Sequence, residues 1–128
     1  MSRNVLLTFV GATAYKKCVY YLDEQHVSGV VRFVQEALGQ LVCNTWGEED
    51  VIYVFLTRDA QKQNWEGARY SSETTDSEGL QHKLRQQNLT CQIESVEKLT
   101  DGFTEEDIWI NFQHIFQCLI LLCQIRNN

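Results

Sequence analysis

The chain has 128 residues, of which 44% are hydrophobic and 22% charged. This composition is typical of a globular protein with one domain, residues 1–128, and no stretch reaches the roughly 18 apolar residues that span a membrane. The net charge of −6 argues against duplex nucleic acid as a partner, because nonspecific binding to a duplex requires a basic face. A small nucleotide is compatible with this charge, since turn amides and helix N-termini can hold phosphates.

The first predicted element is a strand that leads from Asn4 to Val10 into a turn of small residues. Its letters, NVLLTFV, form a nearly continuous apolar run, which predicts a strand buried on both faces of a parallel sheet. Open parallel sheets bind ligands at the carboxyl ends of their strands. The small residues that follow the strand are therefore candidates for ligand binding: Gly11, Ala12, Thr13 and Ala14.

Residues 16–23 predict a brief strand or an extended return, and a helix follows from Ser28 to Cys43 with Ser28 as its cap. A second buried strand covers Val51 to Leu56 and ends at Thr57, before a short helix from Arg58 to Glu66. Within that helix, Trp65 is expected to pack in the core. The polar segment Gly67 to Glu78 predicts a long surface loop.

The second half of the chain predicts a helix from Gly79 and a third strand around Cys91 to Val96. Thr104 and Asp107 match a capping box that opens a last helix with several apolar residues on one face. The tail, residues 120–128, is either a short strand or a continuation of this helix. Strands that alternate with helices predict an α/β fold, a Rossmann-like three-layer sandwich with a mainly parallel sheet.

Further ligand candidates lie beside the two strand ends. Tyr15 either stacks on a base or covers the sheet edge, and Lys16 is either a ligand contact or a solvated charge. Thr57 and Arg58 end the second buried strand, where an arginine can bind phosphate bidentately. The alternative for Arg58 is a helix-start residue in water.

No catalytic or metal-binding pattern is visible in the sequence. The five cysteines are scattered and odd in number, which argues against a disulfide framework and favours the cytoplasm. The three histidines have no partner at ligand spacing, so we expect neither a metal nor a cofactor. The acidic cluster Glu105 to Asp107 is explained by its place at a helix N-terminus.

Several blocks of the sequence together resemble the N-terminal part of the CARF proteins, the CRISPR-associated Rossmann-fold sensors of type III CRISPR defence. The blocks occur in the family's order and cover about Arg3 to Leu119: NVLLTFVGATAYKKCVYYLD, VVRFVQEAL, DVIYVFLTRDAQKQNW, GLQHKLRQQNL and FTEEDIWINFQHIFQCL. The branch that they resemble is that of the Csx-type effectors.

The resemblance implies a homodimer that binds a cyclic oligoadenylate, most often the tetra-adenylate, across its two-fold axis. The family's loop after the first strand corresponds to residues 11–15 here, and its loop after the next core strand to Thr57 and Arg58. Ala12 stands where the family often has a polar residue, so one side-chain contact is expected to be weaker.

The sequence also departs from this family. Members continue into a strand that carries an Asp, Thr, His, Phe and Arg block and then into an HEPN ribonuclease domain, and neither is present among these 128 residues. We therefore expect a sensor domain shortened at its C-terminus, without ribonuclease activity. Two alternatives stay open: a metal-independent ring nuclease that cleaves its own ligand by in-line attack, and an interaction remnant that binds nothing.

Overall fold

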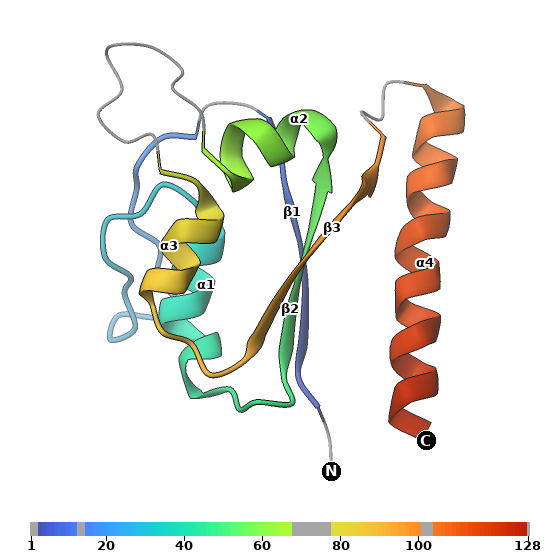
Figure 1. The fold of residues 1–128 in the computed structure, drawn as a ribbon. Helices are drawn as coiled ribbons and strands as arrows, with labels where there is room; N and C mark the ends of the chain where they lie inside the picture. Colours follow the sequence, from blue (N-terminus) through green and yellow to red (C-terminus); the bar gives the residue numbers. More distant parts are fainter. Residues whose placement is uncertain (1–2, 13–14, 68–77, 101–103, 128) are drawn as a thin grey trace.

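Within the residues that the structure describes, three parallel strands form a sheet in the order β1-β2-β3 (Figure 1). The computed structural model describes residues 3–12, 15–67, 78–100 and 104–127. The strands are β1 (Val5–Val10), β2 (Val51–Thr57) and β3 (Gln92–Leu99). All three predicted strands are confirmed in place, because their β-branched and aromatic residues suit a pleated, packed surface. The third continues to Leu99, beyond the predicted end at Val96.

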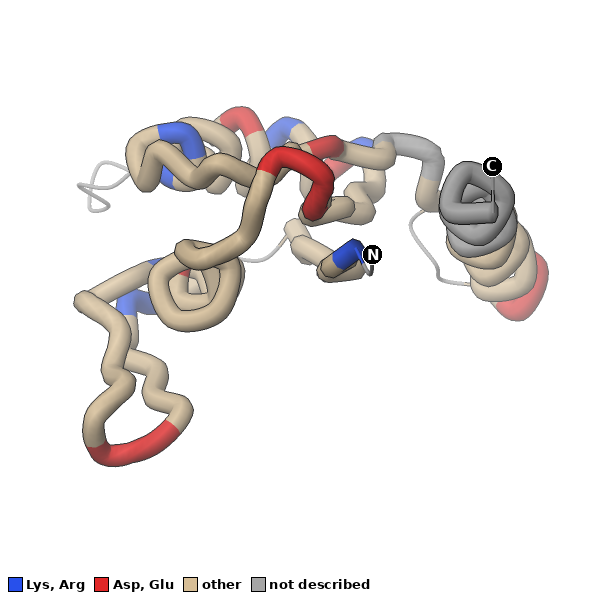
Figure 2. Tube along the Cα trace, turned by 90° about the horizontal axis from the view of Figure 1, so that it is seen from below, with Lys and Arg blue, Asp and Glu red and all other residues tan. Residues whose placement is uncertain are grey.

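Helices connect the strands and flank the sheet. They are α1 (Val34–Leu41), η1 (Cys43–Thr45), α2 (Arg58–Ala60), η2 (Gln61–Trp65), α3 (Leu80–Gln86) and α4 (Glu105–Asn127). Successive right-handed crossovers in one direction put α1 and α3 on the same side of the sheet. Figures 1 and 2 show α4 on the opposite side, next to β3. The predicted α/β class and parallel sheet are therefore confirmed.

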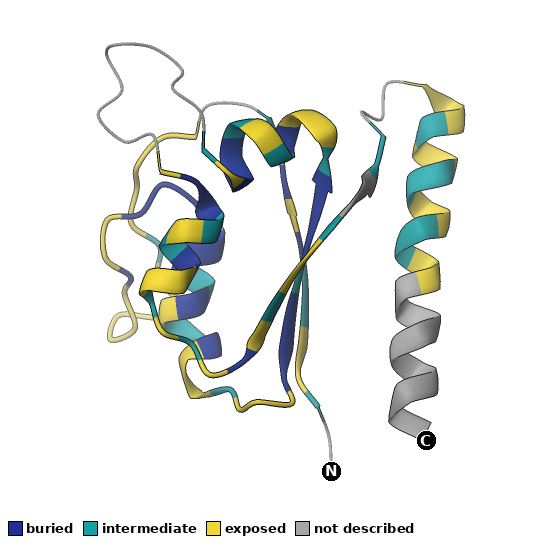
Figure 3. Ribbon diagram, viewed as in Figure 1, coloured by how far each residue is buried: buried dark blue, intermediate teal, exposed yellow. Residues whose placement is uncertain are grey.

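The core lies between the sheet and the layer of α1 and α3. Figure 3 shows the buried positions along β2 and on the inner sides of these two helices. The central strand β2 is buried along most of its length, as its apolar run predicts. The largest fully buried side chains include Phe33, Phe55, Ile52, Leu56, Leu80 and Leu84. Trp65 is 4% exposed, which confirms its predicted place in the core.

The prediction that β1 is buried on both faces is wrong. Thr8 and Val10 are buried on the side of α1, whereas Val5 and Phe9 on the other face are 37% and 53% exposed. The reason is that α4, the helix on this other face, lies next to β3, whereas β1 is at the opposite edge of the sheet. The ring of Phe9 stacks on that of Phe55 in the neighbouring strand, with 5.2 Å between ring centroids. The Phe9 ring thereby covers part of the Phe55 ring.

The predicted start of the first long helix at Ser28 is also wrong. Residues 18–31 form an extended return with antiparallel bridges between Cys18 and Val31 and between Tyr21 and Val27. Of the two alternatives for residues 16–23, this confirms the extended return. The hydroxyl of Ser28 accepts the N–H of Tyr20 instead of capping a helix. These cross-strand bonds hold the segment extended, so α1 begins only at Val34.

The prediction for the last helix is confirmed in its capping and in its continuation through the tail. The hydroxyl of Thr104 accepts the N–H of Asp107 at 3.0 Å, as an N-cap residue does, and the helix continues through the tail to Asn127. Its apolar face is not buried, however, since Ile108, Trp109 and Phe112 are 62%, 59% and 55% exposed. Asn111 joins the helix to the end of β3 by hydrogen bonds with the backbone of Thr100. None of the described helices is long and apolar enough to cross a membrane.

The described cysteines should differ sharply in reactivity. Burial raises the pKa of the Cys43 thiol to about 11, whereas Cys18 is exposed. At pH 8 we expect iodoacetamide to modify Cys43 at least ~100-fold more slowly than Cys18, because the thiolate is the reactive species. Peptide mapping by mass spectrometry measures both rates. In urea the two rates should become equal, and equal rates in the folded protein would contradict the burial of Cys43.

Candidate functional site

The carboxyl ends of β1 and β2 lie side by side, because Val10 pairs with Leu56 in register. Gly11 and Thr57 each come one residue later, so the two predicted loops meet at one edge of the sheet. The hydroxyl of Thr57 caps α2 by accepting the N–H of Ala60 at 3.2 Å. Arg58 follows as the first residue of α2 and is exposed at this edge.

Gly11 is exposed, and both of its backbone polar groups are bound by side chains. Its N–H donates to the hydroxyl of Tyr15 at 2.8 Å, and its carbonyl accepts a hydrogen bond from Nδ2 of Asn64. A Cβ at this position would lie 3.0 Å from the Tyr15 hydroxyl. A side chain at this position would therefore require the Tyr15 hydroxyl to move slightly away from the backbone of residue 11.

Tyr15 packs its ring edge-on against Phe33, with 5.5 Å between ring centroids. The two alternatives for Tyr15, stacking on a base and covering the sheet edge, stay predictions, and 37% of the residue is exposed. Lys16 is exposed and Ala12 is half-buried. Thr13 and Ala14 lie outside the described residues.

Two polar side chains that sequence reasoning did not assign to the site lie beneath Gly11. Asn64 is fully buried and Arg32 is 6% exposed. Nη2 of Arg32 donates to Oδ1 of Asn64 at 2.9 Å, and its Nη1 reaches the carbonyl of Glu78 at 3.5 Å. The guanidinium also lies over the ring of Phe33, 4.5 Å from its centroid. Buried polar groups need such partners, because an unsatisfied one is costly.

The first turn of α1 adds a second set of polar contacts to the same end of β1. Nε2 of Gln35 donates to the hydroxyl of Thr8 at 3.0 Å and to the carbonyl of Phe9 at 2.9 Å. Oε2 of Glu36 accepts the N–H groups of Arg32 and Phe33, both at 3.1 Å. The start of α1 is thus fixed to the strand end by side-chain hydrogen bonds.

A signal for these residues exists in the sequence, but it is weak. Arg32, Gln35 and Glu36 interrupt an otherwise apolar segment, VVRFVQEAL, and all three are buried. In a helix that starts at Ser28, polar residues are expected on the solvent side. Because the predicted helix start was wrong, these three residues were not predicted to be buried. Asn64 precedes a core tryptophan without any periodic pattern around it.

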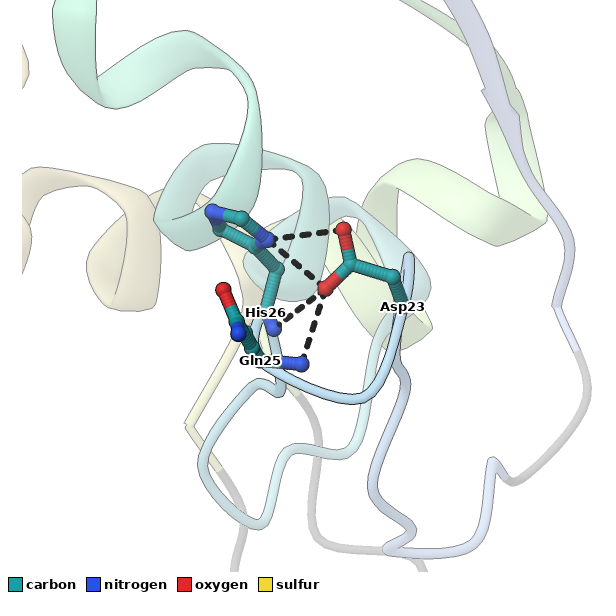
Figure 4. A network of polar contacts seen from close by, with 3 residues as sticks. All are labelled: Asp23, Gln25 and His26. Carbon is teal, nitrogen blue, oxygen red and sulfur yellow. Dashed lines mark hydrogen bonds and ion pairs between the residues drawn. The ribbon is translucent and has the colours of Figure 1, made fainter.

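Two described carboxylates with lowered pKa values lie elsewhere. Asp23 accepts hydrogen bonds from the ring of His26 and from the N–H groups of Gln25 and His26 (Figure 4), and these contacts lower its pKa. This turn protrudes from the body of the protein (Figure 2). Asp50 accepts the N–H groups of Asn4 and Gly47 at the start of β2, which lowers its pKa. Asp23 closes a turn, and Asp50 joins the start of β2 to the residue before β1, so both carboxylates have a structural role.

The carboxyl edge carries the hydroxyl of Thr57 and the exposed Arg58, which are side chains of the kind that bind an anion or a nucleotide. The part of the chain that the structure describes contains no group of three or more histidine, cysteine or acidic residues that could hold a metal ion. A scan against protein-family models finds no match to this chain, and a search of curated proteins finds none either.

Proposed function

We propose that this chain is a CARF-like sensor domain that binds a cyclic oligoadenylate, with cyclic tetra-adenylate as the first ring to test. The observation that carries the proposal is the turn at Gly11, which is exposed and held from below by Asn64 at the carboxyl edge of a parallel sheet. Ligands bind parallel sheets at this edge. The sequence blocks that resemble the CARF family run through the same residues.

The finer fold and the assembly are part of the same proposal. We assign the sheet and its flanking helices to a Rossmann-like three-layer sandwich, with α4 as the third layer. The ligand is proposed to lie across the two-fold axis of a homodimer, so that each protomer supplies one Gly11 turn and one Thr57–Arg58 end. We also propose a cytoplasmic location, which the free cysteines among the described residues, Cys18, Cys43 and Cys91, support.

Local charge supports this site despite the acidic chain. The net charge is −6, but Arg58 is exposed at the carboxyl edge, and Lys16 is exposed next to Tyr15, whose hydroxyl binds Gly11. These two cations can bind the phosphodiester groups of a small ring. A duplex would instead meet the acidic surface as a whole, which supports a small ligand over a duplex.

The proposal is tested by thermal unfolding with and without cyclic tetra-adenylate. At a hundredfold excess over Kd we expect the melting temperature to rise by about 10 °C. Arg58→Gln should weaken binding by about tenfold, because a charge-assisted hydrogen bond is lost. Arg85→Gln changes the net charge equally in the last turn of α3, near the start of β3, and should bind like the wild type.

The outcomes of this test separate the alternatives. If saturating ligand does not raise the melting temperature of the wild type, the proposed function is overturned. The alternative that then stands is an interaction remnant that binds no ligand. Equal losses in Arg58→Gln and Arg85→Gln would contradict the site at the carboxyl edge. Chromatography of the ligand after incubation distinguishes a sensor, which leaves the ring intact, from a ring nuclease.

A further inference from the structure

The backbone of Gly11 is held from two sides by side chains that come from different parts of the chain. Asn64, in η2, donates to its carbonyl from the buried side. Tyr15 accepts its N–H from the exposed side at 2.8 Å. Both peptide groups that flank this exposed residue are thereby oriented by side chains that lie outside the sheet.

The orientation of the Asn64 amide follows from its two partners. A guanidinium can only donate hydrogen bonds, so Arg32 must face the amide oxygen, which it does at 2.9 Å. A carbonyl can only accept, so the amide nitrogen must face Gly11. The two requirements agree, because the Asn64 amide accepts with its oxygen and donates with its nitrogen.

The local backbone explains how Asn64 reaches the strand end. In η2 the N–H of Glu66 donates to the carbonyl of Gln61 at 2.9 Å, which is the i to i+5 bond of a π-helix. This wider turn lets the adjacent residues Asn64 and Trp65 both be buried, at 0% and 4% exposure. Single π-helical turns often occur at functional sites.

We infer that Asn64 and Tyr15 are positioning residues that fix the Gly11 turn in the conformation that the ligand requires. Arg32 acts through Asn64 by holding its amide in the correct orientation. This inference rests on the proposed function, because it concerns the same ligand site. The turn at Gly11 is then pre-organised before the ligand binds, which can be measured in the ligand-free protein.

Asn64→Asp is the most direct variant, because it keeps the size of the side chain and an acceptor for Arg32 but removes the donor to Gly11. We expect two changes: a shift of the carbonyl ¹³C resonance of Gly11 in the free protein, and binding of cyclic tetra-adenylate weakened by about tenfold. Lys62→Met is the matched control in η2, since Lys62 is exposed, and it should change neither quantity.

Tyr15→Phe is the second variant, and it leaves the buried side untouched if Asn64→Asp fails to fold. It removes the acceptor of the Gly11 N–H, so the amide of Gly11 should exchange with solvent about tenfold faster. Its affinity for cyclic tetra-adenylate should fall as well. Circular dichroism and the melting temperature of each variant establish that it is folded.

The free-protein measurements separate this inference from the proposed function. If both folded variants keep the Gly11 resonance, its exchange rate and the affinity of the wild type, the positioning role is overturned while the proposed function stands. If the wild type itself does not bind the ring, the proposed function fails and the positioning role for this ligand fails with it. The resonance and exchange data then still show whether the network holds the turn.

Discussion

Replacing Gly79 by alanine is expected to lower the free energy of unfolding by about 2–3 kcal/mol. An added Cβ would lie 2.2 Å from the carbonyl oxygen of Trp65, 2.5 Å from the carbonyl carbon of Glu66 and 2.7 Å from the nitrogen of Gly67. All three are backbone atoms, so no side chain can rotate away to make room. Instead α3 has to move, and its first residue, Leu80, is completely buried in the core. Urea unfolding measures the loss.

Gly47→Ala is the matched control for this prediction. A Cβ at Gly47 meets nothing within 4 Å, so the substitution should change stability by no more than ~0.5 kcal/mol. A Gly79→Ala protein as stable as the Gly47→Ala protein would show that the start of α3 does not touch the end of η2. The same contact matters to the candidate site, because η2 carries Asn64 and ends where Gly79 packs.

The strands could be predicted from the sequence because their signal is local. Short apolar runs rich in β-branched and aromatic residues, such as Val51 to Leu56, favour a buried strand, and their order along the chain, with helices between them, predicts the parallel arrangement. The burial of β1 could not be predicted in the same way. Its sequence resembles that of β2, and Phe9 is exposed because β1 lies at the edge away from α4, which is a property of the whole fold.

The start of α1 shows a second limit of local reasoning. Ser28 is a good N-cap residue, and the apolar residues after it recur at helical spacing. The structure instead uses the hydroxyl of Ser28 to accept the N–H of Tyr20, eight residues earlier. An extended pairing of this kind competes with the helix, and its strength depends on both segments together.

The candidate site was predictable at its strand ends but not beneath them. Gly11 and Thr57 follow from the rule that parallel sheets bind ligands at their carboxyl edge, and the register places them next to each other. Arg32 and Asn64 lie 32 residues apart in the sequence, and their contact exists only once the segment before α1 lies against η2. A buried polar pair of this kind has no sequence period that could reveal it.

Glu36→Ala is expected to destabilise the fold by about 2–3 kcal/mol, because it removes the acceptor of two backbone N–H groups. Oε2 of Glu36 accepts from Arg32 and from Phe33, both at 3.1 Å, and Glu36 is itself buried. Phe33, the N-cap residue of α1, has no side-chain hydrogen bond that could replace this carboxylate. The helix would therefore begin with unsatisfied donors in a place that water reaches poorly. Urea unfolding measures the change.

Gln40→Ala is the control on the same helix, because its side chain also accepts one backbone N–H, that of Gly29 at 2.9 Å, but is exposed. Water can replace this acceptor, so the loss should stay within ~0.5 kcal/mol. Similar losses in the two variants would contradict a special role of Glu36 at the helix start. Loss of the Glu36 carboxylate is also expected to affect the candidate site, because Glu36 fixes the backbone of Arg32. Arg32 in turn orients Asn64 beneath Gly11, so a loosened helix start should also loosen the Gly11 turn.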